Sequence, residues 1–385
     1  SPTDLGGYTA AAQDDVIVAL PGLDYDPGFR QFSGYLTVDA ERGRRLFYWY
    51  VESQGEPAAD PVVLWTNGGP ACSGLLGLGT EMGPYFIGRN GALTPNPFSW
   101  NKAASMLYVE QPAGTGFSYS DTLADYATGD ARAAGDNYRL VQEFFQRFPE
   151  RRANPFYIAS ESYGGHYMPQ LTLQILHRDQ GRDINFQGML VGNPYVDPFS
   201  NTVTQVQAYY AHGVLAKPLF DHWSDHCATP ATYNSLACQR EEWEMFKGLD
   251  NKINPYALDY PICLEEEATT SRRRLRKATS SQVNQLLRHT NSSAGNPPFL
   301  PPADAYHPCA EEHLATYLNR QDVKEALHVH THKVAVWETC TDAVHYSAAD
   351  RDASLVDLYT DVIRQAGVER GLQIFVFSGD DDSIC

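Results

Sequence analysis

Five runs of mainly apolar residues recur along the chain, and each breaks into glycine or polar residues. They occupy residues 61–70, 105–120, 155–165, 186–197 and 372–383. Continuous apolar runs that end in such loops are typical of parallel strands buried on both faces of a sheet. In open α/β sheets the carboxyl ends of these strands carry the chemistry. We therefore expect the functional residues in the loops that follow these runs.

Hairpin and helical patterns precede and separate the strands. The stretch "FSGYLTVDAERGRRLFYWY" (32–50) has two runs rich in Tyr, Val and Phe around a charged turn with Gly43, which predicts a β-hairpin. Helical spacing appears in "DNYRLVQEFFQRFP" (136–149) and "LVDLYTDVIRQAGV" (355–368). The pattern as a whole predicts an α/β fold with a central, mostly parallel sheet flanked by helices.

The alternation of strands and helices breaks between residues 198 and 310. This segment holds four of the seven cysteines, many prolines and the basic run "SRRRLRK" (271–277). We interpret it as an inserted, mainly helical cap, 198–310, between two parts of the core, 1–197 and 311–385. The basic run is either a solvated loop or a processing site, since exposed Arg-rich loops are easily cut.

Charge and composition exclude several classes of function. A formal net charge of -18 repels phosphate backbones and anionic lipid, so we expect neither nucleic acid nor membrane surfaces as partners. No apolar run approaches the roughly 20 residues that span a bilayer. The acidic balance suits an acidic compartment. The chain begins at Ser1 without a basic-then-apolar leader, so we expect that a signal peptide was removed or never existed.

The seven cysteines show no metal-ligand spacing, so we expect no metal site. Six of them would allow three disulfides with one thiol left over, and the sequon at Asn291 suits the same secretory environment. Seven reduced cysteines in a cytosolic enzyme are the alternative. The alternating His328, His330 and His332 suggest a metal site only weakly, because no fourth ligand is evident.

Ser162 lies in the stretch with the strongest chemical signal. In "YIASESYGG" a strand runs into a glycine turn, and an amphipathic helix follows. This is the context of a nucleophile elbow, where a serine on a strained turn raises its Oγ above the sheet. The pattern G-x-S-x-G appears as Ser160-Glu161-Ser162-Tyr163-Gly164, so a small serine replaces the first glycine.

A second glycine turn, "WTNGGPACSG" (65–74), also ends a strand. Adjacent glycines let backbone N–H groups approach a ligand closely, so the amides of Gly69 and Tyr163 could form an oxyanion hole. A plain tight turn is the alternative for a Gly-Gly pair. The two turns together favour catalysis more than either does alone.

Four segments resemble the serine carboxypeptidase family of the α/β-hydrolases. They are "NGGPACSG", "VEQPAGTGFSYS", "ESYGGHY" and "FVFSGDDDSIC", and they occur in the family's order. The resemblance implies an α/β-hydrolase fold, an inserted cap and removal of C-terminal residues from peptide substrates without a cofactor. It also implies a secreted, lysosomal or vacuolar protein.

The resemblance assigns a role to each matching residue. Ser162 would be the nucleophile, Asp382 the triad acid, and Gly69 and Tyr163 the oxyanion donors. The free carboxylate of the substrate would be bound by Asn67, Gly68, Glu81 and Glu161. The pocket would be lined by Trp65 and the unpaired Cys385. The disulfides would be Cys72–Cys340, Cys227–Cys238 and Cys263–Cys309.

Two carboxylates of this set predict a pH dependence. Glu81 and Glu161 held close together would raise one pKa, so at acidic pH a protonated Glu donates a hydrogen bond to the substrate carboxylate. Near neutral pH both ionise and substrate binding weakens. We therefore expect an acidic optimum for peptides and a higher one for esters or amides without the free carboxylate.

The general base is missing from the pattern. In this fold the chain order is Ser, Asp, His, but all 12 histidines precede Asp382. His166, four residues after Ser162, is interpreted as a packing residue. We expect the catalytic histidine on a C-terminal segment beyond residue 385 or on a separate chain.

Other functions remain open on the same scaffold. Gly74, where many relatives have Ser, resembles family branches that transfer acyl groups from glucose esters, and another branch cleaves hydroxynitriles. A protective or binding relative without catalysis is a further alternative. Asn67, Glu81 and Glu161 together favour peptides, because only a free carboxylate needs that cluster. Dimers are common among such relatives, so a homodimer is a further possibility.

Overall fold

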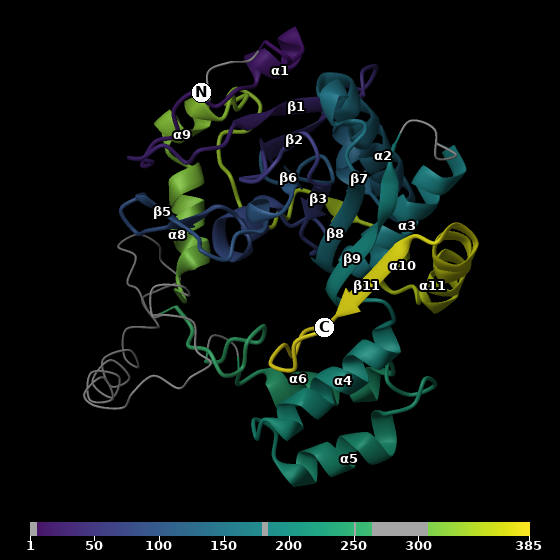
Figure 1. Cartoon of the computed structure of the whole chain (residues 1–385). Coiled ribbons are helices and arrows are strands. Elements are labelled where there is room, and N and C mark those ends of the chain that lie inside the picture. The colour runs from purple at the N-terminus through teal and green to yellow at the C-terminus, as the bar shows by residue number, and fades with distance from the viewer. Residues whose placement is uncertain (1–5, 179–183, 250–251, 264–306) are drawn as a thin grey trace.

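The computed structural model describes residues 6–178, 184–249, 252–263 and 307–385. A seven-stranded sheet forms its centre, in the order β1-β2-β6-β3-β8-β9-β11 (Figure 1). Its strands are β1 (Gln31–Asp39), β2 (Arg44–Val51), β6 (Ser105–Val109), β3 (Val62–Thr66), β8 (Phe156–Ser162), β9 (Phe186–Pro194) and β11 (Gln373–Phe377). β1, β2 and β6 pair antiparallel, and every pair from β6 to β11 is parallel. The predicted hairpin and mostly parallel sheet are thus confirmed.

Short strands and ten α-helices among the described residues surround this sheet. The minor strand pairs are antiparallel β4 (Tyr85–Ile87) with β5 (Leu93–Pro95), and parallel β7 (Ala127–Thr128) with β10 (His345–Tyr346). The helices are α1 (Ala10–Asp14), α2 (Asp130–Arg147), α3 (Gly164–Arg178), α4 (Pro198–Ala211), α5 (Lys217–Cys227), α6 (Leu236–Phe246), α8 (Ala310–Leu318), α9 (Gln321–Ala326), α10 (Ala348–Arg351) and α11 (Val356–Val362). None of the described helices has the length and apolar character needed to cross a bilayer.

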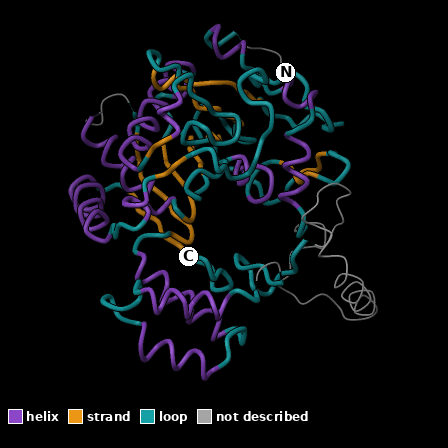
Figure 2. Tube along the Cα trace, turned by 180° about the vertical axis from the view of Figure 1, so that it is seen from behind, coloured by secondary structure: helices purple, strands orange, loops and turns teal. Residues whose placement is uncertain are grey.

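Each face of the sheet buries its own apolar core. On one face α2, α3 and α11 pack against the strands, with Phe144 and Leu171 fully buried. On the other face α8, α9 and the segment around 71–87 cover the sheet, with Leu78 and Leu314 buried. The strands therefore lie between a helical layer on one side and mainly loops with short helices on the other, as Figure 2 shows from behind.

Helix α2 differs from its predicted bounds, whereas the predicted helix 355–368 is found as α11 continued by a π-helix. α2 begins at Asp130 rather than near 136, because the amide of Asp130 donates to Asp350 Oδ2 at 3.0 Å and the helix starts on this contact. Its first turns bury the small Ala133 and Ala134, which carry little of the apolar periodicity used to find helices. α11 ends at Val362, and its last turns widen into a π-helix over Ile363–Val368.

Helices α4, α5 and α6 form a separate layer beyond the carboxyl ends of the strands (Figure 1). Asp197 caps α4 by accepting a hydrogen bond from the Ser200 amide, and a proline follows at the first helical position. The layer has its own small core around Trp223. The division of the chain at 197 and 310 stays a prediction. Asn291 and the basic run 271–277 lie outside the described residues.

Three disulfides occur in the described chain, and their sequence separations range from 11 to 268 residues. They join Cys72 with Cys340, Cys227 with Cys238, and Cys263 with Cys309. These are the pairs that the family resemblance implies. Cys385 is the free cysteine.

β11 forms one edge of the sheet and is poorly covered. Phe375, Val376 and Phe377 are 56%, 49% and 43% exposed, respectively. In the described part of the chain, no strand pairs with the outer edge of β11. An apolar strand with a free edge of this kind can accept a further strand.

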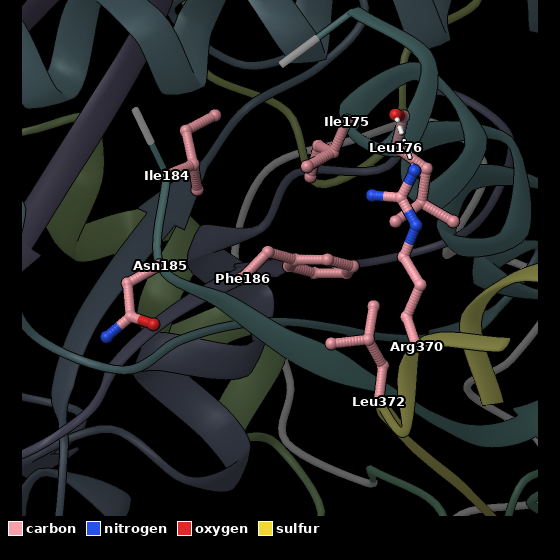
Figure 3. A pocket seen from close by; sticks show the side chains of 7 residues that line it. All are labelled: Ile175, Leu176, Ile184, Asn185, Phe186, Arg370 and Leu372. Atoms are coloured by element: carbon pink, nitrogen blue, oxygen red, sulfur yellow. Dashed lines mark hydrogen bonds between the residues drawn. The ribbon is translucent and has the colours of Figure 1, made fainter. Parts of the chain in front are cut away.

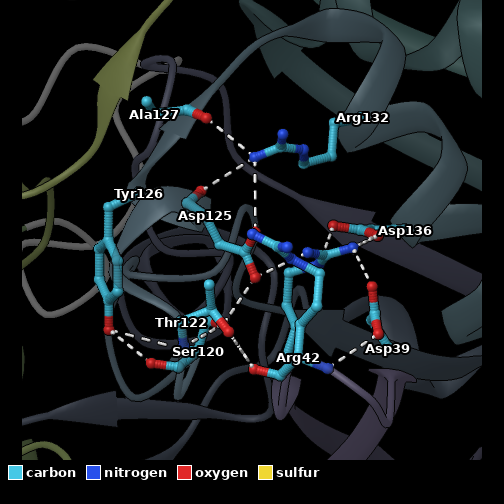
Figure 4. A network of polar contacts seen from close by, with 10 residues as sticks. Asp39, Arg42, Ser120, Thr122, Asp125, Tyr126, Ala127, Arg132 and Asp136 are labelled. Carbon is cyan, nitrogen blue, oxygen red and sulfur yellow. Dashed lines mark hydrogen bonds and ion pairs between the residues drawn. The ribbon is translucent and has the colours of Figure 1, made fainter.

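A buried ion-pair network fixes the turn of the β1–β2 hairpin to α2 and to the segment before it (Figure 4). Arg44 contacts both Asp125 and Asp136 at 2.8 Å, and Arg42 contacts Asp125 at 2.7 Å. Burial alone would raise the pKa of Asp125, but hydrogen bonds from Arg42, Ser120 and Arg44 outweigh it and lower that pKa to about 2. Asp125 is therefore an ionised, fully paired structural carboxylate.

Candidate active site

Ser162 lies on a tight turn between β8 and α3. Its φ is +56°, in the left-handed region that a non-glycine residue adopts only under constraint. A Cβ at Gly68 would lie 2.4 Å from the Tyr163 nitrogen, and one at Gly164 would lie 2.0 Å from Ser160 Oγ. Only glycine fits at both positions, because the turn is pressed against the neighbouring strand end. This strand–turn–helix geometry is that of a nucleophile elbow.

The loop after β11 folds over Ser162. The Ser162 Oγ lies 3.7 Å from Cys385 Sγ. Asp382 Oδ1 accepts hydrogen bonds from the amides of Ile384 at 2.7 Å and Cys385 at 3.4 Å, which closes the loop into a tight turn. Burial raises the pKa of Asp382 and raises the pKa of Cys385 to about 11, so the thiol stays protonated. The structure thus brings the predicted nucleophile, triad acid and free cysteine together.

Asn193, at the carboxyl end of β9, supports this loop and was missed by the sequence analysis. It has a left-handed φ of +42°. Its Oδ1 accepts from the Gly379 amide at 3.3 Å, its Nδ2 donates to the Cys385 carbonyl at 3.5 Å, and its side chain also bonds Asp382. The Gly-Asn-Pro sequence at a strand end is a turn signal that could have identified it.

Asn67 joins two carboxylates beside the elbow. Its Nδ2 donates to Glu161 Oε1 at 2.6 Å and to Glu81 Oε1 at 3.1 Å. Its Oδ1 accepts from Trp65 Nε1 at 2.8 Å and from the Gly77 amide at 3.1 Å, which fixes the orientation of the amide group. Trp65 is 2% exposed and lies beneath Asn67, so it orients this residue instead of lining an open pocket.

Glu81 and Glu161 act as a coupled pair. Burial raises the pKa of both carboxyl groups, and the charge of Glu161 raises that of Glu81 further. Asn67 bonds both carboxyl groups and so holds them close together, and the pair as a whole retains a proton at acidic pH. Although Glu81 as a residue keeps exposed surface, its carboxyl group is desolvated beside Asn67 and Glu161, and this local desolvation raises its pKa. At acidic pH the cluster therefore offers a hydrogen-bond donor to an anion.

The glycine turn after β3 lies against the elbow. Among the described residues, the main-chain amides of Gly69 and Tyr163 donate no hydrogen bond. The disulfide from Cys72 to Cys340 anchors the turn to a distant segment. Ala71 adopts a φ of +68°, which costs a non-glycine residue roughly 1–2 kcal/mol.

Glu110 is a fully buried carboxylate beneath this turn. It accepts hydrogen bonds from Ser73 Oγ at 2.5 Å, Trp337 Nε1 at 2.6 Å and the Phe117 amide at 2.6 Å. A Cβ at Gly116 would lie 1.9 Å from Glu110 Oε1, so the motif "AGTG" needs glycine there. Burial raises the pKa of Glu110 to about 7, although the three hydrogen bonds lower it in part.

Glu110 predicts a pH-dependent stability. Its pKa rises from 4.5 to about 7 on folding, so its contribution is complete below pH 4.5 and is lost as the pH rises towards 7. Relative to the parent, Glu110→Gln should gain up to about 3 kcal/mol of unfolding free energy over this interval, because the amide does not titrate. Urea unfolding at several pH values measures the difference, and a difference that is constant with pH would contradict the assignment.

Most described histidines bond residues remote from the catalytic loop, but His212 Nε2 lies 3.3 Å from Asp381 Oδ1, beside Asp382. His166 Nδ1 lies 2.9 Å from Asp130 Oδ2, and His328 Nδ1 lies 3.0 Å from the Ser33 carbonyl oxygen. His330 stacks on Tyr35 with ring centroids 4.2 Å apart. In the described part of the chain, no histidine hydrogen-bonds Ser162 or Asp382.

One group of possible metal ligands occurs among the described residues. It consists of Cys263, Cys309 and Glu312. Both sulfur atoms are already joined in a disulfide, so they cannot act as thiolate ligands. This group therefore does not make a metal site.

A loop within the predicted cap, around residues 255–258, bonds the segment that carries Asp382. The amide of Ser383 donates to the Pro255 carbonyl at 2.8 Å, and the amide of Leu258 donates to the Asp381 carbonyl at 3.0 Å. Between these contacts, Tyr256 is 63% exposed. The two main-chain bonds on either side of it place Tyr256 near the loop that carries Asp382, and burial raises the pKa of its hydroxyl. Sequence reasoning did not identify this residue.

A small cavity of about 170 Å³ lies elsewhere (Figure 3). It lies between the last turns of α3, the start of β9 and the residues before β11, and its lining includes Leu176, Phe186 and Arg370. Ser162 lies at the carboxyl end of β8, whereas this cavity lies near the amino ends of the parallel strands. The cavity is therefore not part of the candidate site.

The sequence of this chain is similar to one family model and to individual proteins. A family model described as serine carboxypeptidase matches residues 21–385. Serine carboxypeptidase-like 26 of Arabidopsis thaliana is 37% identical over 378 residues, which cover 97% of this chain and 78% of that protein. P-(S)-hydroxymandelonitrile lyase of Sorghum bicolor is 34% identical over 97% of this chain and 70% of its own length.

A solved structure supports the fold. The crystal structure of Kex1Δp, a prohormone-processing carboxypeptidase from Saccharomyces cerevisiae, superposes with a TM-score of 0.68. The match covers 97% of this chain and 79% of that one, at 21% identity. At 21% identity this similarity supports the fold alone, which is the α/β-hydrolase architecture.

Proposed function

This chain belongs to the serine carboxypeptidase family, and on that premise we propose that it releases C-terminal amino acids from peptides at acidic pH. The observation that carries the proposal is the cluster of Asn67, Glu81 and Glu161 beside Ser162. A protonated carboxyl group paired with an ionised one suits a substrate that ends in a free carboxylate. A hydrolase for uncharged esters would gain nothing from this pair.

The reaction would proceed through an acyl-enzyme. Ser162 Oγ attacks the last peptide carbonyl, while the amides of Gly69 and Tyr163 donate hydrogen bonds to the oxyanion. The C–N bond then breaks, the base returns a proton to the departing amino acid, and water hydrolyses the ester on Ser162. Asp382 orients the base throughout.

The general base is proposed to come from polypeptide outside residues 1–385. Two features support this. None of the hydrogen bonds or ion pairs of the described histidines reaches Ser162 or Asp382: His166 bonds Asp130, and His212 contacts Asp381. The apolar strand β11 leaves an edge on which a further strand would end beside Asp382.

The proposed setting is the secretory pathway, including lysosomes or vacuoles. Three disulfides support it, because such bonds persist in oxidising compartments. Glycosylation at Asn291 remains part of this proposal.

The activity is tested with N-blocked dipeptides. The intact protein is expected to release the C-terminal amino acid faster at about pH 5 than at about pH 8, because a protonated carboxyl binds the substrate carboxylate. Amino-acid release is measured by chromatography. A protein that is correctly folded and releases no amino acid at any pH would overturn the proposal.

A second candidate is a lyase or acyltransferase on the same scaffold. It is favoured by the 34% identity to a hydroxymandelonitrile lyase and by Gly74. Cyanide release from hydroxymandelonitrile, or acyl transfer from a glucose ester, without amino-acid release from dipeptides would favour it. A catalytically inactive binding relative would show none of these activities.

A further inference from the structure

Asp130 gathers four side-chain donors around one buried carboxylate. Its Oδ1 accepts from Tyr163 Oη at 3.0 Å and Tyr346 Oη at 2.6 Å. Its Oδ2 accepts from His166 Nδ1 at 2.9 Å and Gln170 Nε2 at 2.7 Å. These partners come from the elbow, β10 and α3, whereas Asp130 itself opens α2. Asp130 is 7% exposed, so the bonds are made away from water.

One of these partners connects the carboxylate to the elbow. Tyr163 directly follows Ser162, whose φ is left-handed. Its side chain is fixed by a hydrogen bond from the hydroxyl and by stacking on the face of the ring. The hydroxyl bonds Asp130, and the ring stacks on His166 with centroids 4.3 Å apart at 17°. The Tyr163 ring is 3% exposed. Fixing this ring fixes the main chain that carries it, including the amide beside Ser162.

The negative charge of Asp130 is needed for this arrangement. An ionised carboxylate accepts from all four donors, whereas an amide offers one oxygen and two N–H donors. Asparagine would therefore leave N–H groups facing the N–H donors of His166 or Gln170, or the hydroxyls of the tyrosines. Although burial would raise the pKa of Asp130, the hydrogen bonds from His166 and Tyr346 outweigh it and lower that pKa.

We propose that Asp130 is a positioning residue of the oxyanion hole, which holds the Tyr163 amide in line for the oxyanion formed at Ser162. The inference rests on the proposed function and adds to it a residue that does not touch the substrate. Because the oxyanion exists only in the transition state and the intermediate, a displaced amide lowers kcat and leaves substrate binding intact. Peptides and esters should be affected alike, since both pass through the same oxyanion.

The test compares Asp130→Asn with a matched control, Asp125→Asn, in the intact protein. Asp125 is also buried and multiply bonded, but its partners are Arg42 and Arg44, away from the elbow. Asp130→Asn is expected to lower kcat about 10- to 100-fold for both a blocked dipeptide and its ester, with KM within about twofold. Asp125→Asn is expected to lower the unfolding temperature and leave kcat per active site unchanged.

Tyr163→Phe is a second variant that tests the same role if Asp130→Asn does not fold. It removes one of the four hydrogen bonds and is expected to lower kcat about three- to tenfold at unchanged KM. An unchanged kcat in the folded variants, or a loss confined to KM, overturns the positioning role while the parent's activity preserves the proposed function. A parent protein that is inactive on both substrates overturns the proposed function, and this inference with it.

Discussion

Replacement of Ser162 by alanine is expected to lower kcat for a blocked dipeptide by about 10⁴- to 10⁶-fold. The variant loses the atom that forms the acyl-enzyme, while the amides of Gly69 and Tyr163 remain to give a small residual rate. The removed hydroxyl contacts only Cys385 among the hydrogen bonds of the described residues, so folding should be preserved. Amino-acid release per folded molecule measures the effect.

Ser160→Ala is the matched control for this experiment. Ser160 lies two residues earlier in β8, and its Oγ donates to the Thr66 carbonyl at 2.6 Å. Loss of this hydrogen bond costs about 1–3 kcal/mol of stability and should leave kcat within about tenfold of the parent. If Ser162→Ala and Ser160→Ala had equal activity, Ser162 would not be the nucleophile.

The second large effect is a pH dependence confined to peptides. The pKa of Glu81 and that of Glu161 are both raised, so the pair holds a proton at acidic pH and loses it as the pH rises. Above the raised pKa the pair carries two negative charges, which repel the substrate carboxylate. We expect the ratio of peptide to ester kcat/KM to fall about 10- to 100-fold between about pH 5 and pH 8.

The ratio isolates the carboxylate cluster from the rest of the machinery. Ionisation of the catalytic base changes both substrates equally and cancels. Glu81→Gln keeps an N–H donor at every pH, so its ratio is expected to stay nearly constant over the same range. A parent and variant with the same pH-dependent ratio would contradict the role assigned to Glu81 and Glu161.

Local signals predicted the core of this fold. The apolar runs gave β3, β6, β8, β9 and β11, because buried parallel strands need continuous apolar sequence. The elbow at Ser162 could also be predicted from the sequence, because the sharp turn requires small residues on both sides of the serine. Asn67, Glu81 and Glu161 came only from the family resemblance, since they lie on separate segments that meet in three dimensions.

Other features depend on tertiary contacts that no local pattern encodes. In the sequence, Asp130 is only an acidic residue at the start of a helix. Its partners become visible in the fold, where the hydroxyls of Tyr163 and Tyr346 donate hydrogen bonds to it. Tyr256 reaches the site because its loop bonds the residues around Asp382. Trp65 was expected to line the pocket, but its N–H bonds Asn67 and its ring is buried.

Reaction of the intact protein with a fluorophosphonate, followed by peptide mass mapping, tests the central claim most directly. We expect a single phosphonyl group on Ser162, formed more slowly when a blocked dipeptide with a free carboxylate is present at acidic pH. A folded protein without modification at Ser162, or one modified at another residue, would contradict it.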